Sequence, residues 1–160
     1  MSGQVRRVDQ QMASAAAAML PEKITKELRT RYRQLPVQIR MSGMAATYAY
    51  LLGKSTDSDL GRAYRRVAEG IRHHLTTRSG LVDGAKANTG EKLLHALADL
   101  DPSVYARASA EVQALAGWLG RLAEARWIAT GGDTKRNASR NADGGAQGDA
   151  DDETPGGGQR

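Results

Sequence analysis

The sequence predicts an all-α protein, a small single-domain helical bundle. Apolar residues recur at helical spacing through residues 1–130, and no useful length of chain alternates apolar and polar residues as a half-buried strand would. Hydrophobic residues make up 40% of the chain, but aromatic residues only 4%, and phenylalanine is absent. A core built from Ala, Leu, Val and Met favours closely packed helices over a β-sandwich. The length of 160 residues suits one domain of ordinary size.

The first helical region is expected to extend over residues 5–35, with an interruption at Pro21. Two apolar stripes mark this region, and a continuous helix would place them about 130° apart. Proline costs about 3 kcal/mol in a helix interior but little in a first turn. We therefore predict that the chain breaks or kinks near Leu20 and Pro21. The first stripe comprises Val5, Val8, Met12, Ala16 and Met19, and the second comprises Ile24, Leu28 and Leu35.

Two further helices are expected, one from Pro36 to Leu52 and one over residues 59–77. Proline is favoured in a first helical turn, and the polar segment 55–59 supplies N-cap residues for the second helix. The expected buried residues of the first are Val37, Met41, Met44, Tyr48, Leu51 and Leu52. Those of the second are Leu60, Ala63, Tyr64, Val67, Ile71, His74 and Leu75.

The rest of the predicted domain is a loop followed by two helices. Residues 79–90 contain three glycines and no periodicity, which predicts a loop. A short helix over 91–99 is expected to end before Asp101 and Pro102, and a long helix is expected over 104–128. The expected buried residues of the long helix are Val112, Leu115, Ala116, Leu119, Leu122, Ala123 and Trp127.

Residues 131–160 differ in composition from the predicted helical domain of residues 1–130. They contain no large apolar side chain, so they cannot bury enough surface to offset the entropy of ordering. We expect a disordered, Gly/Asp-rich acidic tail. The tail contains four basic and six acidic residues, a net charge of −2. The whole chain has a net charge of +5, so residues 1–130 carry +7. A basic folded part indicates a polyanionic partner, usually nucleic acid, although many proteins of similar pI bind none.

Several classes of function are excluded or disfavoured by composition. The chain has no cysteine, which excludes disulfides, thiolate metal centres and thiol catalysis. No segment approaches the 18 or so apolar residues that a membrane helix needs. The apolar run after Arg6 and Arg7 imitates a signal peptide, but Asp9 interrupts the pattern. We therefore expect a mature helix there and a cytoplasmic protein.

Catalytic motifs are also missing. Gly53 and Lys54 belong to a GKST tetrapeptide, but the residue five before Gly53 is Tyr48, within a predicted helix, so no phosphate-binding loop is expected. His73 and His74 have no carboxylate at ligand spacing, and no acidic pair lies in an apolar setting. We predict no catalytic residue, no metal, no cofactor and no small-molecule substrate.

Basic residues gather on two helix faces. Lys26, Arg29 and Arg33 share one face of the first basic helix, opposite its apolar stripe. On the 59–77 helix, the face opposite the core holds Arg62, Arg65, Arg66, Arg72 and His73, with only Glu69 among them. Like charges repel at this spacing, so a one-sided face indicates phosphate binding. An ordinary solvated face is the alternative.

Two other sites allow two interpretations each. Arg40, Gly43 and Thr47 fall on one line of a helix, where a glycine costs about 1 kcal/mol relative to alanine. Either Gly43 admits another backbone while Arg40 reaches a phosphate, or the helix kinks after Ser42, which caps the next segment. The last helix presents a flat face with Trp118 at its border, which suits protein docking or simply covers the core. That face holds Ala114, Gly117, Gly120, Arg121 and Glu124.

Two segments carry a resemblance to a known family. LPVQIRMSGMAATYAYLLGK, residues 35–54, resembles the "LPxxIRxxGLxxxLAFxxxK" segment of the small subunit of type III-B CRISPR–Cas (Cmr) effector complexes. WLGRLAEARW, residues 118–127, is similar to the C-terminal "WLKRFAEAL" signature of that family. The resemblance covers residues 5–128. The sequence departs from the family pattern at Gly120, which replaces a basic residue, and at Met44, Tyr48 and Tyr50, which replace the usual Leu and Phe.

The resemblance implies a non-catalytic helical subunit without cofactors. In this family, copies stack along the complex beside the other Cmr effector subunits and hold target RNA opposite the guide RNA through its sugar–phosphate backbone. The implied partners are the guide RNA–target RNA duplex region, the other Cmr subunits and further copies of itself. The expected subunit-interface residues are Gly43, Gly117, Trp118 and Gly120. The expected RNA-binding residues are Lys23, Lys26, Arg29, Arg33, Arg40, Arg62, Arg65, Arg66 and Arg121.

Two other functions remain open at this point. A free-standing helical nucleic-acid-binding regulator would need a recognition helix after a short turn, and segment 55–59 is the one candidate for that turn. A metal-dependent nuclease would need an acidic cluster, which the sequence does not display.

Overall fold

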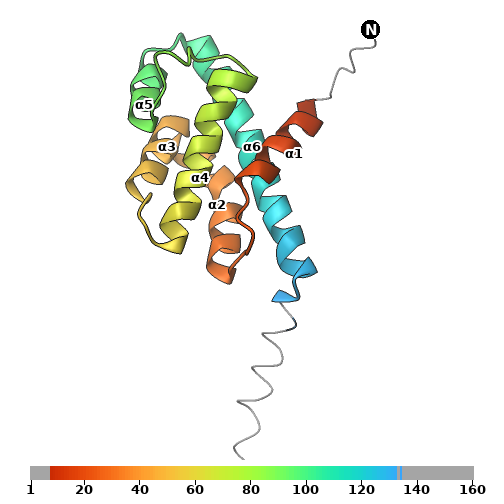
Figure 1. The fold of residues 1–160 in the computed structure, drawn as a ribbon. Coiled ribbons are helices and arrows are strands. Elements are labelled where there is room, and N and C mark those ends of the chain that lie inside the picture. Colours follow the sequence, from red (N-terminus) through yellow and green to blue (C-terminus); the bar gives the residue numbers. More distant parts are fainter. Residues whose placement is uncertain (1–7, 133, 135–160) are drawn as a thin grey trace, which may run out of the picture.

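The computed structural model describes residues 8–132 and 134, and this part of the chain is all-α (Figure 1). Six α-helices and one π-helical turn are present, and no strand occurs among the described residues, so the predicted fold class is confirmed. Val5, Arg6 and Arg7 lie outside the described residues, as does most of the predicted tail, at 133 and 135–160.

The helix breaks at Pro21, and of the two predicted possibilities, a break or a kink, the break is confirmed. Helix α1 (Val8–Met19) ends just before it, and residues 20–25 are not helical. The Thr25 hydroxyl then accepts a hydrogen bond from the Leu28 amide at 3.1 Å and caps the next helix. The prediction that Val8 is buried was wrong: its side chain is 67% exposed, because it begins α1 at the periphery of the molecule (Figure 1).

Helix α2 (Lys26–Ser42) passes through Pro36, so the prediction that a new helix starts there was wrong. Its buried stripe is Leu28, Tyr32, Leu35 and Ile39, at the alternating spacing of four and three residues that one helix face requires. Burying these four side chains contributes several kcal/mol, which offsets the roughly 3 kcal/mol that an interior proline costs. The continuous helix leaves Val37 and Met41 outside the stripe, and both are exposed rather than buried as predicted.

The helix break falls at Gly43 instead. Gly43 has φ 88° and ψ 159°, a region open essentially to glycine alone, and its amide donates to the Ile39 carbonyl at 2.9 Å. Helix α3 (Met44–Gly53) starts at the next residue. The predicted kink after Ser42 is therefore present, but without a side-chain cap. Apart from its two chain neighbours, no described residue has an atom within 4 Å of a Cβ built at Gly43, so no other described segment of this chain approaches it; its predicted place at a subunit interface stays a prediction.

Replacing Gly43 with alanine is expected to lower the free energy of unfolding by about 2 kcal/mol, because the new Cβ strains this backbone conformation. Chemical denaturation followed by circular dichroism measures the change. Gly53→Ala is the matched control, since Gly53 also has open space around its Cβ but lies in the last turn of a helix. An equal loss in both variants, or none in Gly43→Ala, would contradict the assigned strain.

Helix α4 (Asp59–His73) is capped by Ser58, whose hydroxyl accepts from the Gly61 amide at 3.0 Å, as segment 55–59 predicted. The predicted apolar stripe is confirmed, with Leu60 only partly buried. The helix does not continue unchanged to residue 77. It becomes a π-helical turn, η1 (His74–Arg78), whose end is marked by the Ser79 amide donating to the His74 carbonyl at 2.9 Å.

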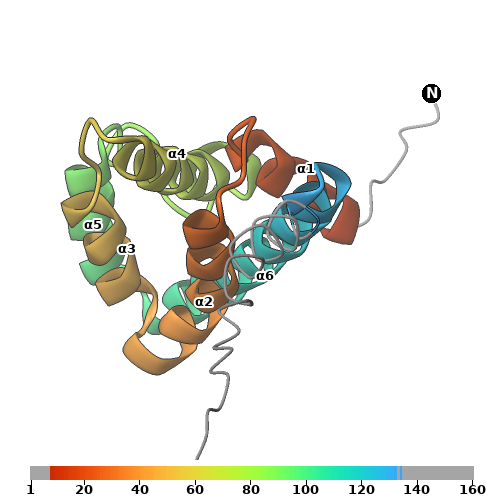
Figure 2. The same ribbon diagram turned by 90° about the horizontal axis from the view of Figure 1, so that it is seen from below.

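The last two helices follow the predicted loop over 79–90. Helix α5 (Gly90–Ala98) is capped by Thr89, and α6 (Pro102–Ala129) by Asp101. At 28 residues, α6 is about 42 Å long, and α1 and α2 make their most extensive contacts with it. Seen from below, α2 and α1 lie against α6, while α3, α4 and α5 close the opposite side (Figure 2). None of the described helices is both long and apolar enough to cross a membrane.

Candidate nucleic-acid interface

Three basic residues form a line along α2. Lys26, Arg33 and Arg40 are seven residues apart, so each lies nearly two helical turns beyond the last, on one face. All three are exposed. Sequence analysis had placed Arg40 on a different helix from the other two, and the passage of α2 through Pro36 unites them. We call these three residues the α2 ridge; it extends about 21 Å along the helix axis.

A groove between α2 and α6 runs beside the α2 ridge. It encloses about 350 Å³ and is lined by Arg33 and Pro36 from α2 and by Gly117, Gly120, Arg121 and Glu124 from α6. The exposed Arg121 stacks on Trp118, with its guanidinium carbon 5.6 Å from the ring centroid. The groove therefore adds a fourth cation beside the α2 ridge. A Cβ at Gly117 would meet open space, which leaves this part of the groove accessible.

Glu124 holds two of the predicted RNA-binding arginines. The Arg29 guanidinium donates twice to it, from Nε to Oε2 at 2.5 Å and from Nη2 to Oε1 at 2.6 Å. Arg33 Nη2 donates to Oε2 at 3.1 Å. Arg29 is only 20% exposed and stacks 5.5 Å from the Trp127 ring, whereas Arg33 is 66% exposed. Arg29 thus joins α2 to α6 inside the fold, whereas most of the Arg33 side chain stays exposed.

These hydrogen bonds hold the pKa of Glu124 below its usual range, chiefly through Arg29. A carboxylate with a lowered pKa in the folded state stabilises the protein above its unfolded pKa, near 4.3, and this contribution is lost as pH falls through the folded value. Glu124→Gln is expected to lower the free energy of unfolding by about 1–2 kcal/mol at neutral pH.

The pH dependence separates this charge effect from a packing effect. As pH falls from 7 into the acid range, the difference in free energy of unfolding between the wild-type protein and Glu124→Gln should shrink, because the wild-type carboxylate becomes protonated. Urea denaturation at a series of pH values measures it. A difference that stays constant down to acid pH would contradict the ionic origin.

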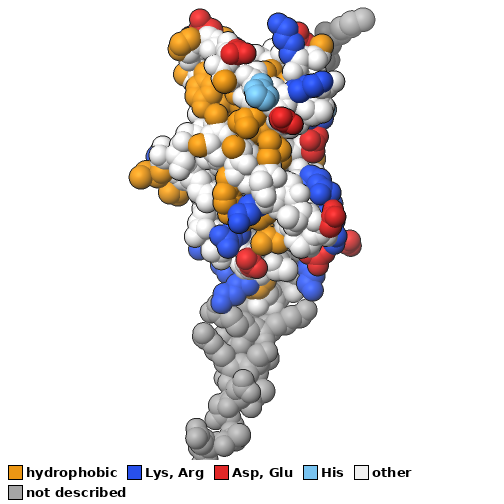
Figure 3. Space-filling view, turned by 90° about the vertical axis from the view of Figure 1, so that its left-hand side faces the viewer, with side chains coloured by type: hydrophobic (Ala, Val, Ile, Leu, Met, Phe, Trp, Pro, Cys, Tyr) orange, Lys and Arg blue, Asp and Glu red, His pale blue; other side chains and the backbone are white. Residues whose placement is uncertain are grey.

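The second basic group lies around the start of α4. We call Lys23, Arg62, Arg65 and Arg66 the α4 cluster. Arg62 pairs with Asp59, Arg65 lies 3.3 Å from Asp57, and Arg66 donates to the Leu20 carbonyl at 3.1 Å. Figure 3 shows carboxylates among the Lys and Arg side chains on the lower half of one face. Exposed pairs of this kind contribute about 0–1 kcal/mol, so a phosphate can displace them.

Sequence analysis missed these carboxylates because it compared only the charges on one face of the 59–77 helix. Asp57 precedes that helix, and Asp59 occupies its first turn, yet both side chains lie beside arginines further along. The α4 cluster is therefore a mixed surface, in contrast to the α2 ridge. Among the described residues, no acidic side chain lies within ion-pair distance of Lys26, Arg40 or Arg121.

Gly120 makes a contact within the protein. A Cβ at Gly120 would lie 3.3 Å from the Tyr32 carbonyl oxygen, so the glycine lets α6 approach the α2 backbone closely. Pro36 has no amide hydrogen to donate to that carbonyl, four residues before it, so the oxygen is left facing α6. Trp118 is partly buried against the core. Neither observation tests their predicted place at a subunit interface, but both residues also serve the fold.

A partly buried polar pair escaped sequence analysis. His74 lies on the apolar stripe as predicted and is only 3% exposed, but its Nε2 is 3.0 Å from Glu111 Oε2 on α6. Arg107 donates to the other oxygen of Glu111 at 3.3 Å. The contact links η1 to α6 across 37 residues of sequence, and no local pattern could have revealed it.

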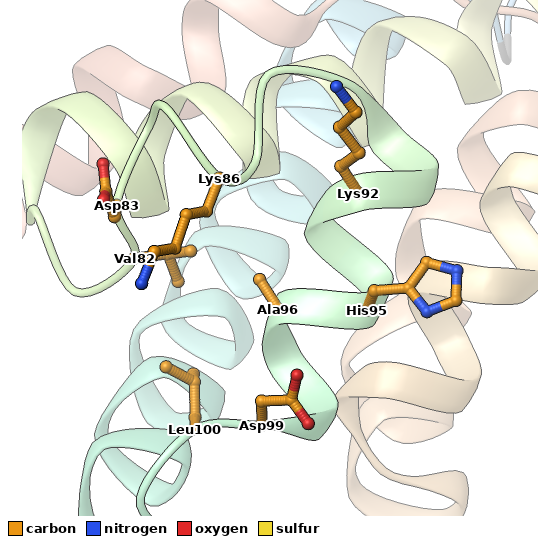
Figure 4. Close-up of a pocket in the computed structure, with 8 residues that line it drawn as sticks. All are labelled: Val82, Asp83, Lys86, Lys92, His95, Ala96, Asp99 and Leu100. Atoms are coloured by element: carbon orange, nitrogen blue, oxygen red, sulfur yellow. The ribbon is translucent and has the colours of Figure 1, made fainter.

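One cavity of about 370 Å³ lies between the 79–90 loop and α5 (Figure 4). Its wall is apolar at Val82, Ala96 and Leu100, but the charged side chains at its edge do not converge: His95 and Lys92 point away from it in Figure 4. Small-molecule sites combine an apolar wall with convergent polar groups, which this cavity lacks. Within residues 8–132 and 134, no group of three or more potential ligands could hold a metal ion.

The fold and its surface define a small all-helical protein whose exposed basic side chains suit a polyanionic partner. The profile of a family described as CRISPR-associated protein (Cas_Cmr5) matches residues 4–126. The chain belongs to this family, and the resemblance to a small subunit of the type III-B (Cmr) CRISPR system is confirmed. No curated protein and no solved structure matches the chain significantly.

Proposed function

We propose that this protein is a non-catalytic structural subunit of a type III-B effector complex that holds target RNA opposite the guide RNA. The observation that supports this most directly is the α2 ridge, a line of cations on one rigid helix. Within the described part of the chain, its residues meet no competing carboxylate except at Arg33, which Glu124 holds at a single contact. A nucleic-acid backbone is a line of negative charges, and a line of cations matches it without reading bases.

The proposed role needs no sequence readout by the protein. In an RNA-guided complex, base pairing with the guide selects the target, and protein subunits contact the backbone. The α2 ridge, Arg121 and the more exposed members of the α4 cluster supply such contacts. Arg29 is the weakest of the predicted RNA-binding residues, because Glu124 and Trp127 already surround its guanidinium.

A second surface on α2 suits contact with other subunits. Val37 is 51% and Met41 is 79% exposed, one turn apart on the helix. Exposed apolar side chains of this kind mark protein contacts when they adjoin other docking features. The open groove at Gly117 and the stacked Trp118 lie nearby on α6. We propose that copies of this protein and other Cmr subunits contact this region as they stack along the complex.

Single alanine replacements on the α2 ridge test the RNA contact. For single-stranded RNA, each lost phosphate contact lowers the steepness of the salt dependence of binding by about 0.7. Lys26→Ala, Arg33→Ala and Arg40→Ala should each show this change when binding is followed by fluorescence anisotropy over a salt series. Arg31→Ala is the matched control, because Arg31 lies on the same helix but pairs with Glu27 and is outside the α2 ridge.

Unchanged salt slopes in all three variants would place the RNA elsewhere. Preferential binding of one duplex DNA sequence by the isolated protein would instead favour the free-standing regulator. Magnesium-dependent cleavage of RNA that disappears on replacing one carboxylate would contradict the non-catalytic role.

A further inference from the structure

The 20–25 segment connects the end of α6 to the α4 cluster. Arg126, in the last turn of α6, donates from Nη1 to the Pro21 carbonyl at 2.7 Å, so the helix end is fixed against the 20–25 segment. Figure 1 shows the lower end of α6 close to the connection between α1 and α2. A cavity of about 320 Å³ opens between that segment and the start of α4, and Lys23, Arg62 and Arg66 line it.

This cavity has an excess of positive charge. Among the described residues that line it, Asp59 is the one carboxylate, against three cations. The Asp59 side chain is 98% exposed and pairs with Arg62, so it neutralises little of the charge on the other two. Arg66 makes its contact with a carbonyl oxygen rather than a carboxylate. The cavity therefore has room for additional negative groups.

The sequence beyond α6 supplies such groups. Residues 149–153 hold four carboxylates in five positions, Asp149, Asp151, Asp152 and Glu153. Position 151 follows position 134 by 17 residues, and a chain of that length spans up to about 55–60 Å. This reach exceeds the roughly 42 Å length of α6, and it begins at the end of the molecule where the cavity opens.

We propose that the acidic segment 149–153 docks at Lys23, Arg62 and Arg66 and competes there with nucleic acid. Arginine forks bind carboxylates and phosphates with the same geometry, so the segment imitates a short stretch of backbone. The docking rests on charge and reach alone, and only the competition rests on the proposed RNA-holding function.

The expected docking is weak and reversible. Each exposed ion pair contributes about 0–1 kcal/mol, while a segment on the same chain acts at an effective concentration on the order of millimolar. The segment then occupies the cavity for part of the time. A nucleic acid held also by the α2 ridge displaces it, whereas a polyanion that touches the α4 cluster alone competes poorly. The consequence is selection against non-specific polyanions.

A spin label tests the docking directly. The chain contains no cysteine, so Ala150→Cys provides a single labelling site in the full-length protein. Paramagnetic relaxation should broaden the backbone amide signals of Lys23, Arg62 and Arg66 at low salt, and high salt should restore them. The same label in D151N/D152N/E153Q should give little broadening. Absence of broadening in the labelled wild-type protein, or equal broadening in both, overturns the docking.

A binding measurement tests the competition. D151N/D152N/E153Q should bind a short oligouridine about two- to fivefold more tightly than the wild-type protein at low salt. D83N/E91Q/D99N is the matched control, because it changes the net charge equally at exposed positions in the 79–90 loop, in α5 and just after α5. Equal tightening in both variants would show a general charge effect and overturn the competition.

The two measurements separate this inference from the proposed function. If the label broadens the amide signals of the α4 cluster but neither the wild-type protein nor any variant binds RNA, the docking stands and the RNA-holding role fails. If RNA binds through the α2 ridge but the label broadens nothing, the role stands and the docking fails.

Discussion

Replacing Lys26, Arg33 and Arg40 together with alanine is expected to weaken binding of single-stranded RNA about 50-fold at about 0.15 M salt. Three lost phosphate contacts lower the salt slope by about 2, and at this ionic strength a slope change of that size corresponds to the stated loss. The fold should remain intact, because all three side chains are exposed and lie away from the α2 stripe. Anisotropy of a labelled RNA oligonucleotide, with circular dichroism as a folding check, measures both.

A matched triple variant controls for a general effect of net charge on RNA affinity. R78A/K86A/K92A removes the same charge from exposed positions in η1, the 79–90 loop and α5. Its affinity should fall by only a fewfold, since no ordered contact is lost. A similar loss in both triple variants would mean that RNA responds to net charge rather than to the line of cations on α2.

The second large effect concerns Gly61, in the first turn of α4. A Cβ at Gly61 would lie 2.6 Å from both the Thr56 backbone nitrogen and the Thr56 carbonyl oxygen. A backbone neighbour cannot rotate away as a side chain can, so the chain before α4 must move. Gly61→Ala is expected to lower the free energy of unfolding by about 2–3 kcal/mol. Urea denaturation with an unchanged m-value measures the loss.

Gly117→Ala is its control and should act in the opposite direction. Gly117 lies within α6, and a Cβ there meets no atom within 4 Å, so alanine should add up to about 1 kcal/mol through helix propensity. If both variants were stabilised, the contact between Gly61 and Thr56 would not be the constraint that the structure indicates.

Most of the fold was predictable from apolar periodicity, and the errors have specific causes. Local propensity rules place Pro36 at a helix start, but the stripe from Leu28 to Ile39 stabilises the helix on both sides of it. Because the helix continues through Pro36, its buried stripe keeps the phase set by Leu28, and Val37 and Met41 are exposed instead of buried. Tertiary packing therefore decided a boundary that short-range rules could not.

The basic character of the site was predictable, but its pairing was not. The sequence identified Arg29 and Arg33 as cations on one face, yet their shared partner, Glu124, is more than 90 residues away. Likewise, nothing local to His74 indicates Glu111. Contacts between distant segments depend on how the helices cross, and a single sequence does not encode that crossing in any local pattern. Composition and periodicity thus find the candidates, and packing decides which remain available.

At the π-helical turn η1, which follows α4, the chain can lose one residue with little change to the rest of the fold. Each residue of an α-helix advances by about 100°, so a single insertion or deletion within α4 would rotate its apolar stripe away from the core. A π turn already accommodates one residue more than an α turn. Removing one residue between His74 and Arg78 would restore ordinary helical geometry and leave the upstream stripe in register, so homologues one residue shorter at this position can keep the same core.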